Sequence, residues 1–205
     1  MFGVLQKSGD MGNKRMFAVS LIGGVTAASI YAYLKGESSE VEYVRSNVDG
    51  RQYLVQKIKQ EGAGSSEAAD ALGKISTDVE ALIRHMQEKF PGDERVERMA
   101  KRFDPSQVSE GSSHTGYTSY SVNKSALVLC LRQTDDSFAP VGVSMYVALH
   151  ELAHLANDEV GHGNKFWSIF RWILKEAVAI GIYKKVDYAK NPTPFCGITV
   201  DSSVI

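Results

Sequence analysis

The sequence predicts an α+β domain preceded by an N-terminal transmembrane helix. Residues 16–34 form an apolar run that contains no charged side chain. Short β-rich runs flank turn residues at 41–58 and again at 118–132, so we expect two hairpins and a short antiparallel sheet. Longer segments carry apolar residues at three- and four-residue steps and therefore predict helices, at residues 66–90, 141–157 and 166–180.

The run at residues 16–34 is long enough to cross a bilayer, which takes about 20 mostly apolar residues. Lys14 and Arg15 precede it and Glu37 follows it, and basic residues tend to stay on the cytoplasmic side. We therefore expect a single membrane span, with the N-terminus in the cytoplasm and the domain on the far side. The alternative is a cleaved signal peptide, with small residues at 27–29 near the cleavage site, and a secreted domain.

The chain divides into three predicted parts. Residues 1–35 are the cytoplasmic stub and the anchor, residues 36–64 a hairpin and linker, and residues 65–205 the main domain. The 23 basic and 24 acidic residues leave a formal net charge of −1. The net charge therefore produces no overall electrostatic attraction for nucleic acid, an acidic substrate or an anionic membrane surface.

Turn and cap residues indicate where the first elements begin and end. An Asp-Gly pair at 49–50 suits the positive φ angles of a hairpin turn. Ser65 or Ser66 can cap the first long helix. A Pro-Gly pair at 91–92 ends this helix, and a short helix follows at 93–103, whose charged residues we expect on a solvated face.

The middle of the chain is expected to be a loop followed by the second hairpin. Residues 104–117 lack apolar periodicity and are rich in serine and glycine, which is typical of a surface loop. The strand at 126–131 is predicted either to be an edge strand, which could align an extended peptide, or to be an ordinary core strand. Cys130 and Cys196 are too few for a disulfide scaffold, and they could either pair in an oxidising compartment or remain two buried thiols.

A metal-binding motif occupies the helix predicted at 141–157. His150 and His154 are one turn apart, so both imidazoles project from the same face and can reach one zinc ion. Glu151 follows the first histidine, and its carboxylate can take up the proton of a metal-activated water without binding the metal. The H-E-x-x-H spacing therefore predicts a hydrolytic zinc site with Glu151 as the catalytic acid and base.

His162 is the predicted third ligand. It follows His154 by eight residues and lies between Gly161 and Gly163, which allow the chain to turn back toward the metal. Glu176, on the next helix, is the competing ligand, because some zinc peptidases take a carboxylate from that position. Asp158 and Glu159 are expected to be loop carboxylates or groups that orient an imidazole. A donor to the developing oxyanion could be Tyr183, Tyr188 or His114.

The segments HELAHL and GHGNKFW resemble the zinc peptidase superfamily that includes the SprT-like and WLM proteases and the YgjP-like hydrolases. This resemblance implies a zincin-like domain, in which a short antiparallel sheet packs on the H-E-x-x-H helix and the following helix. It implies that His150, His154 and His162 are the metal ligands. It also implies that Glu151 is the catalytic acid and base and that Phe166 and Trp167 pack behind the site. The gap before His162 is longer than is usual in WLM and YgjP-like sequences, which leaves the subfamily open. Residues 115–201 also resemble uncharacterised metallopeptidase-like proteins of large DNA viruses.

These observations predict a membrane-anchored zinc metallopeptidase that acts on a peptide or protein. The alternative is a membrane-anchored interaction protein with a structural zinc site, although such a site usually has four protein ligands and no use for Glu151. SprT-like and WLM relatives act on proteins crosslinked to DNA. The chain shows no basic patch or aromatic platform for nucleic acid, so we do not expect that substrate here. The oligomeric state is left open.

Overall fold

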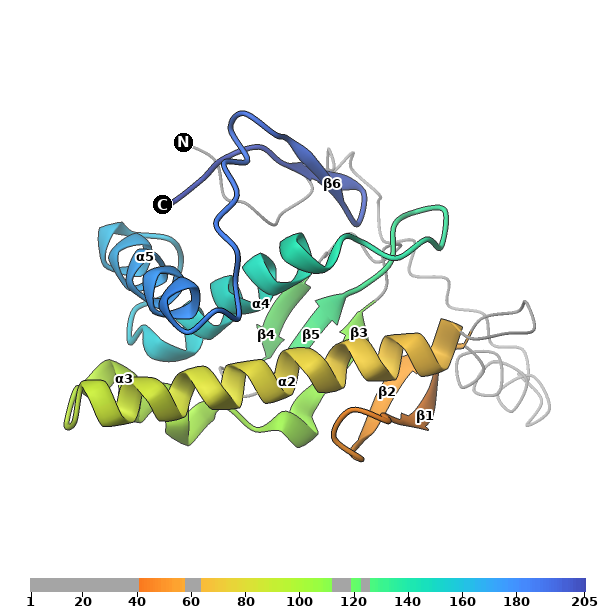
Figure 1. Ribbon diagram of the computed structural model, residues 1–205, viewed down its shortest axis with the longest axis horizontal. Coiled ribbons are helices and arrows are strands. Elements are labelled where there is room, and N and C mark those ends of the chain that lie inside the picture. The colour runs from red at the N-terminus through yellow and green to blue at the C-terminus, as the bar shows by residue number, and fades with distance from the viewer. Residues whose placement is uncertain (1–40, 58–63, 112–118, 123–125) are drawn as a thin grey trace, which may run out of the picture.

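The structure is a computed structural model that describes residues 41–57, 64–111, 119–122 and 126–205. The described residues form the mixed α+β architecture that the sequence predicts (Figure 1). In chain order its elements are β1 (Val41–Arg45), β2 (Gln52–Gln56), α2 (Gly64–Lys89), α3 (Glu94–Arg102), the 3-10 turn η1 (Pro105–Gln107), β3 (Val108–Gly111), β4 (Ser119–Val122), β5 (Ala126–Cys130), α4 (Val141–Ala156), α5 (Asn164–Ala179), β6 (Thr193–Phe195) and β7 (Ile198–Val200).

The main sheet is mixed, so the prediction of an antiparallel sheet is wrong. Its strand order is β1-β2-β3-β5-β4. The two predicted hairpins, β1–β2 and β4–β5, are antiparallel. Strand β3 lies between them and pairs in parallel with both β2 and β5. The β2–β3 pair is parallel because the chain passes through α2 and α3 between these strands, and such a crossover returns a strand in the same direction.

Strand β3 lies in the segment that we expected to be a surface loop. A buried ion pair explains why this polar segment can lie inside the sheet. The side chains of Glu110 and Arg132 are 0% and 3% exposed, and Arg132 Nε donates to Glu110 Oε1 at 2.8 Å. The backbone N–H of Gln56 donates to the other oxygen of Glu110 at 2.7 Å. The partners come from distant parts of the chain, so no local pattern could reveal this strand.

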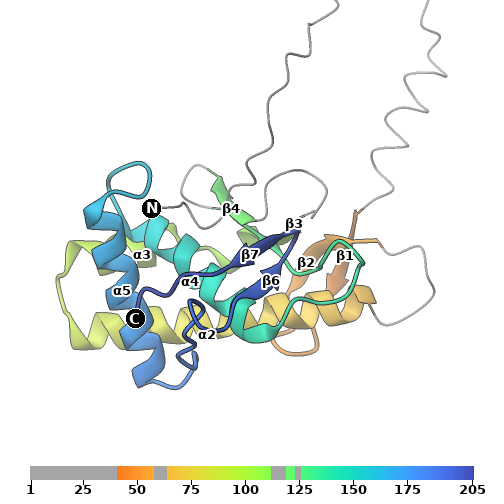
Figure 2. The ribbon, with the colours of Figure 1, turned by 90° about the horizontal axis from the view of Figure 1, so that it is seen from above.

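Helices α2 and α4 pack against the same face of the sheet (Figures 1 and 2). Leu54, Ser109 and Val128 are register partners across β2, β3 and β5, and all three are half-exposed. The residues on either side of them in these strands therefore point to the opposite face, where Tyr53, Val55, Val108, Leu127 and Leu129 are buried. The core lies between this face and the two helices.

The predicted helices are confirmed. Along α2 the apolar positions at helical spacing are all buried, namely Leu72, Ile75, Val79, Leu82 and Met86. Helix α3 is the short helix expected after the Pro-Gly pair, and Asp93 caps it by accepting a bond from the backbone N–H of Arg95. Ser65 does not cap α2, because it lies within the first turn and donates to the side chain of Glu42 at 2.8 Å.

A disulfide joins Cys130 at the end of β5 to Cys196 in the C-terminal hairpin, with the two Cα atoms 6.3 Å apart. Of the two alternatives for these cysteines, the structure therefore has the paired one. Cys196 and Gly197 have φ angles of 50° and 79°, as a two-residue turn between β6 and β7 requires. The predicted C-terminal tail thus contains a hairpin that is crosslinked to the main sheet.

We expect reduction of this disulfide to lower the free energy of unfolding by about 2–4 kcal/mol. The bond spans 66 residues, and closing a loop of that length restricts the unfolded chain by roughly 4 kcal/mol in the entropic description. Urea unfolding with and without reductant measures the difference. A Cys196→Ala variant is the control, because its stability should not respond to reductant; equal stability of the oxidised and reduced wild type would contradict the prediction.

Among the described residues, no helix is long and apolar enough to cross a membrane. The predicted span at residues 16–34 lies outside the described residues. The anchor and its orientation therefore remain predictions.

Candidate metal centre

Helix α4 carries the two histidines of the H-E-x-x-H motif on one of its faces. His150 is 1% exposed, and Glu151 is 3% exposed. His154, one turn further along, is half-exposed. The other faces of α4 are occupied by core residues, so the backbone that carries these side chains is held by packing on several sides.

The loop between α4 and α5 brings His162 to the same point. His162 Nε2 lies 3.0 Å from His150 Nε2 and 3.1 Å from His154 Nε2. The ligand atoms of all three residues lie within 4.8 Å of one another, so the three imidazoles could hold a metal ion. Gly161 makes the return of the chain possible, because its φ of 84° is in the left-handed region that glycine tolerates best.

An aromatic wall from the first turns of α5 supports the three imidazoles. The ring of Phe166 contacts all three, with centroid distances of 4.8 Å to His150, 4.3 Å to His154 and 4.7 Å to His162. Trp167 lies 5.7 Å from the ring of His162. These contacts agree with the packing role that the resemblance implies for Phe166 and Trp167. They restrict the imidazole orientations before any metal binds.

The burial of His150 keeps its imidazole uncharged. Desolvation, and then the neighbouring His154 and His162, lower the pKa of His150 well below its ordinary value. Desolvation also lowers the pKa of His162. A neutral imidazole offers a lone pair to a cation, as a metal ligand must. The buried Nδ1 of His150 has no hydrogen-bond partner among the described residues, so aromatic packing, rather than a carboxylate behind the ring, orients it.

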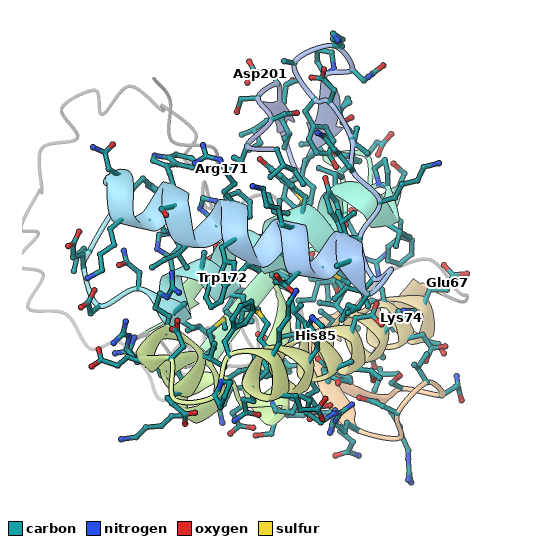
Figure 3. The ribbon with its side chains drawn as sticks, turned by 60° about the vertical axis from the view of Figure 1, so that its left-hand side comes forward. Glu67, Lys74, His85, Arg171, Trp172 and Asp201 are labelled. Atoms are coloured by element: carbon teal, nitrogen blue, oxygen red, sulfur yellow. A yellow bond between two sulfur atoms is a disulfide. The ribbon has the colours of Figure 1, made fainter. Side chains whose placement is uncertain are left out.

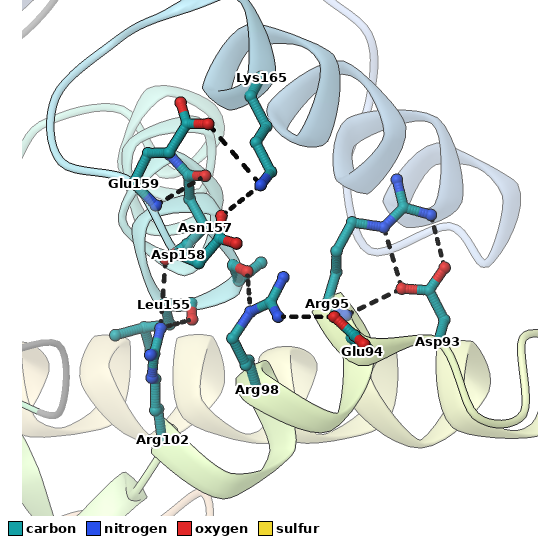
Figure 4. A network of polar contacts seen from close by, with 11 residues as sticks. Asp93, Glu94, Arg95, Arg98, Arg102, Leu155, Asn157, Asp158, Glu159 and Lys165 are labelled. Carbon is teal, nitrogen blue, oxygen red and sulfur yellow. Dashed lines mark hydrogen bonds and ion pairs between the residues drawn. The ribbon is translucent and has the colours of Figure 1, made fainter.

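Two arginines of α3 contact the C-terminal end of α4 (Figure 4). Arg98 Nε donates to the carbonyl of Ala156 at 2.8 Å. Arg102 Nη1 donates to the carbonyls of Leu155 and Asn157 at 2.7 and 3.2 Å. The last carbonyls of a helix lack partners within it and carry partial negative charge, so two guanidinium groups stabilise this end. These contacts lie where α4 ends and the loop to His162 begins.

The sequence-based interpretation missed this function of α3, because we expected its charged residues on a solvated face. The four-residue spacing of Arg98 and Arg102 places both on one side of the helix, but the sequence does not indicate what faces them. The Arg98 side chain is only 21% exposed. The expectation of a solvated face is therefore wrong for these two residues.

We expect Arg102→Ala to lower the free energy of unfolding by about 2 kcal/mol, since a hydrogen bond to a charged group contributes about 1.5–3 kcal/mol. Lys101→Ala is the matched control, because Lys101 is exposed on the same helix and should change stability by less than about 0.5 kcal/mol. Chemical denaturation measures both variants. Equal stabilities of the two variants would show that the carbonyl contacts contribute nothing.

The loop carboxylates Asp158 and Glu159 contact a lysine of α5. Lys165 Nζ lies 2.5 Å from Asp158 and 3.7 Å from Glu159 (Figure 4). The hydrogen bond from Lys165 lowers the pKa of Asp158. These contacts join the loop to the first turn of α5, next to His162. Of the two predicted roles, they favour loop carboxylates over groups that orient an imidazole.

Glu176, the competing third ligand, binds two residues of α2. Its Oε2 lies 2.9 Å from His85 Nε2 and 2.8 Å from Lys89 Nζ. Figure 3 shows His85 of α2 and Trp172 of α5 where these two helices meet. Glu176 is not among the residues that converge with His150.

Two of the candidate oxyanion donors pack on Tyr146, which lies one helical turn before His150. Tyr183 and Tyr188 are buried, and their rings lie 6.1 and 5.0 Å from that of Tyr146. His114 lies outside the described residues. Strand β5 is not the edge of the sheet, because β3 occupies one side of it and β4 the other. The edge-strand prediction for residues 126–131 is therefore wrong.

Sequence comparison finds relatives among large DNA viruses. The chain is 32% identical over 184 residues to Uncharacterized protein R325 of Acanthamoeba polyphaga mimivirus, a match that covers 87% of this chain and 91% of the relative. The chain belongs to the family of that protein. It is also 25% identical over 177 residues to Uncharacterized protein 136R of Invertebrate iridescent virus 6, which covers 82% of this chain and 94% of that protein.

A shorter match joins this viral family to a third protein. Uncharacterized protein 042R of Invertebrate iridescent virus 3 is 36% identical over 75 residues, which cover 36% of this chain and 47% of that protein. No protein-family model matches the chain. No solved structure matches it. The likeness to proteins of large DNA viruses is thus confirmed, while membership of the zinc peptidase superfamily stays a prediction.

Proposed function

We propose that this chain is a zinc-dependent metallopeptidase that hydrolyses peptide bonds. His150, His154 and His162 hold the zinc ion, and Glu151 is the catalytic acid and base. One observation carries the proposal, namely the convergence of three imidazole nitrogens beside a glutamate that follows the first of them on the same helix.

The donor set suits zinc. Tetrahedral zinc with Zn–N bonds of about 2.0–2.1 Å places ligand nitrogens roughly 3.3 Å apart. The Nε2 distances of 3.0 and 3.1 Å need to open by only a few tenths of an ångström to match this spacing. The described residues supply three ligands and no fourth, an arrangement typical of catalytic rather than structural zinc sites.

A zinc ion bound there supplies Lewis acidity, which polarises a carbonyl and acidifies water. The carboxylate of Glu151 accepts the proton of the attacking water and returns it to the leaving amine. Its burial, with 3% of the residue exposed, limits competition from bulk solvent for that proton. The ring of Phe166 packs against both His150 and His154 and so limits how far their imidazoles can move.

Strand β4 is the best-placed element to align an extended peptide. It is the last strand of the described sheet and packs beside α4, which carries the catalytic motif. A strand at the end of a sheet presents unpaired backbone groups, and these can pair with a peptide of many sequences. The proposed substrate is accordingly a peptide or an extended segment of a protein.

Metal analysis and a cleavage assay test the proposed function together. The purified full-length protein should contain one zinc ion per chain and cleave members of a diverse peptide library. Removal of zinc by a chelator should abolish cleavage, and addition of zinc should restore it. Full zinc occupancy with no cleavage of any library member would instead favour a structural zinc site.

We also propose that residues 16–34 attach the protein to a membrane and that the domain lies on the far side. The disulfide between Cys130 and Cys196 supports this location, because disulfides persist mainly in oxidising compartments. Secretion after signal cleavage would meet the same condition, and the mass of the mature protein distinguishes the two alternatives.

Deletion of residues 1–35 should release the protein from membranes, since the longest uncharged apolar run is lost. Extraction with alkaline carbonate measures this, with the full-length chain expected in the pellet and the deleted chain in the supernatant. The anchor proposal fails if the deleted chain still sediments with membranes or if the full-length chain never does.

A further inference from the structure

A second candidate site lies behind the metal-binding helix. A cavity of about 500 Å³ is lined by residues from the N-terminal half of α2, from residues 131–145 and from residues 181–184. Its α4 residues include Val141 and Met145, which precede His150 and His154 by nine residues each. Nine residues are about two and a half turns of helix, so the cavity and the histidines lie on opposite faces of α4.

The walls of the cavity are apolar. They include Ile75 from α2, Phe138 from the segment that leads into α4, Met145 from α4 itself, and Ile182 from the segment after α5. Binding sites for small molecules typically have volumes of about 300–1,000 Å³ and mostly apolar walls with a few polar groups. In size and lining, this cavity therefore suits an apolar ligand rather than ordered water.

Four charged residues line the cavity, and two of them, Glu67 and Lys184, have no ion-pair partner among the described residues. Lys74 binds Asp78 at 2.5 Å. Glu67 lies in the first turn of α2, where the helix N-terminus stabilises a negative charge; Figure 3 labels Glu67 and Lys74 on this half of α2. Lys184 is exposed and has no acidic partner among the described residues. Lys184 is therefore available to pair with an anionic group of a bound ligand.

We propose that this cavity binds a free fatty acid, a linear aliphatic carboxylate whose chain lies against Ile75, Phe138 and Met145 and whose carboxylate lies at Lys184. The site is separate from the metal centre, so binding does not depend on zinc. Because α4 forms one wall of the cavity, the ligand contacts the back of the helix that carries His150.

Photo-crosslinking of the full-length protein with a diazirine derivative of dodecanoate tests the proposal. Crosslinks should map to residues 131–145 and 181–184, and excess unlabelled dodecanoate should suppress them. Ala71→Trp places a large side chain in the cavity and should raise the half-saturating concentration at least about tenfold. Thr77→Trp, on an exposed part of α2 outside the cavity, is the matched control and should label like wild type.

Two further variants separate blocking from misfolding and test the anionic group. A leucine side chain at position 142 would also enter the cavity, because a Cβ added to Gly142 meets no atom within 4 Å. Leucine also has a higher helix propensity than glycine, so the Gly142→Leu variant is compatible with α4. It should therefore fold and reduce labelling as Ala71→Trp does. Lys184→Glu should weaken labelling by the carboxylate by about two- to fivefold or more, as expected for an exposed ion pair, and should leave labelling by the methyl ester unchanged.

The proposal is overturned if crosslinks fall only in residues 16–34, or if both cavity-filling variants label like wild type. Equal labelling by the carboxylate and its methyl ester would refute the anionic ligand. Chelator-treated protein should label as strongly as zinc-loaded protein, so a failure of the proposed peptidase function leaves this test intact.

Discussion

Glu151→Gln is expected to retain zinc and the fold while peptide hydrolysis falls by about 10² to 10⁴-fold, the usual contribution of general acid and base catalysis. Glutamine has nearly the shape of glutamate but cannot accept the proton of the attacking water. Glu151 is not among the three converging residues, so zinc affinity should remain close to that of wild type. Steady-state hydrolysis of a peptide from the library and metal analysis of the same sample give both quantities.

Glu88→Gln is the matched control for this variant. Glu88 is exposed on α2 and has the same side chain, so the substitution should leave both zinc content and hydrolysis unchanged. Hydrolysis by Glu151→Gln at the wild-type rate would rule out a catalytic function of this carboxylate. Loss of zinc together with activity would mean that Glu151 supports the metal rather than the chemistry.

Removal of either helical histidine should weaken zinc binding by more than about 100-fold, because loss of groups that merely orient a ligand already costs about 10–100-fold. We expect His150→Ala and His154→Ala to abolish measurable binding. His162→Ala should weaken it strongly, but less completely, because this residue lies on the exposed loop rather than on the buried helix. Competition with a chromophoric chelator measures the affinities.

His85→Ala and Glu176→Ala are the controls for the metal ligands. His85 binds Glu176 between α2 and α5, so its removal should change stability but leave zinc affinity unaltered. Glu176→Ala should behave in the same way, if the carboxylate serves only this contact. Loss of zinc in Glu176→Ala, with normal affinity in His162→Ala, would reverse the choice of third ligand.

Several features could be predicted from the sequence because they depend on neighbouring residues. Apolar spacing determined α2, α4 and α5, whose buried faces match the predicted stripes. The four-residue spacing of His150 and His154 was sufficient to place them together, since a helix aligns such positions whatever surrounds it. The glycine beside His162 indicated a reversal of the chain, and Gly161 has the positive φ that such a reversal uses.

Other features depend on which distant segments meet, and only the tertiary structure decided them. Strand β3 lies inside the sheet, where its buried Glu110 pairs with Arg132, 22 residues further along the chain. Cys130 and Cys196 pair because the C-terminal hairpin packs on α4 and hydrogen-bonds to Gln133, shortly after β5. Glu176 binds Lys89 because α5 turns this residue toward α2. Such contacts join residues that are far apart in the sequence. The local sequence around a residue therefore does not show which distant residue it will contact once the helices and strands have packed together.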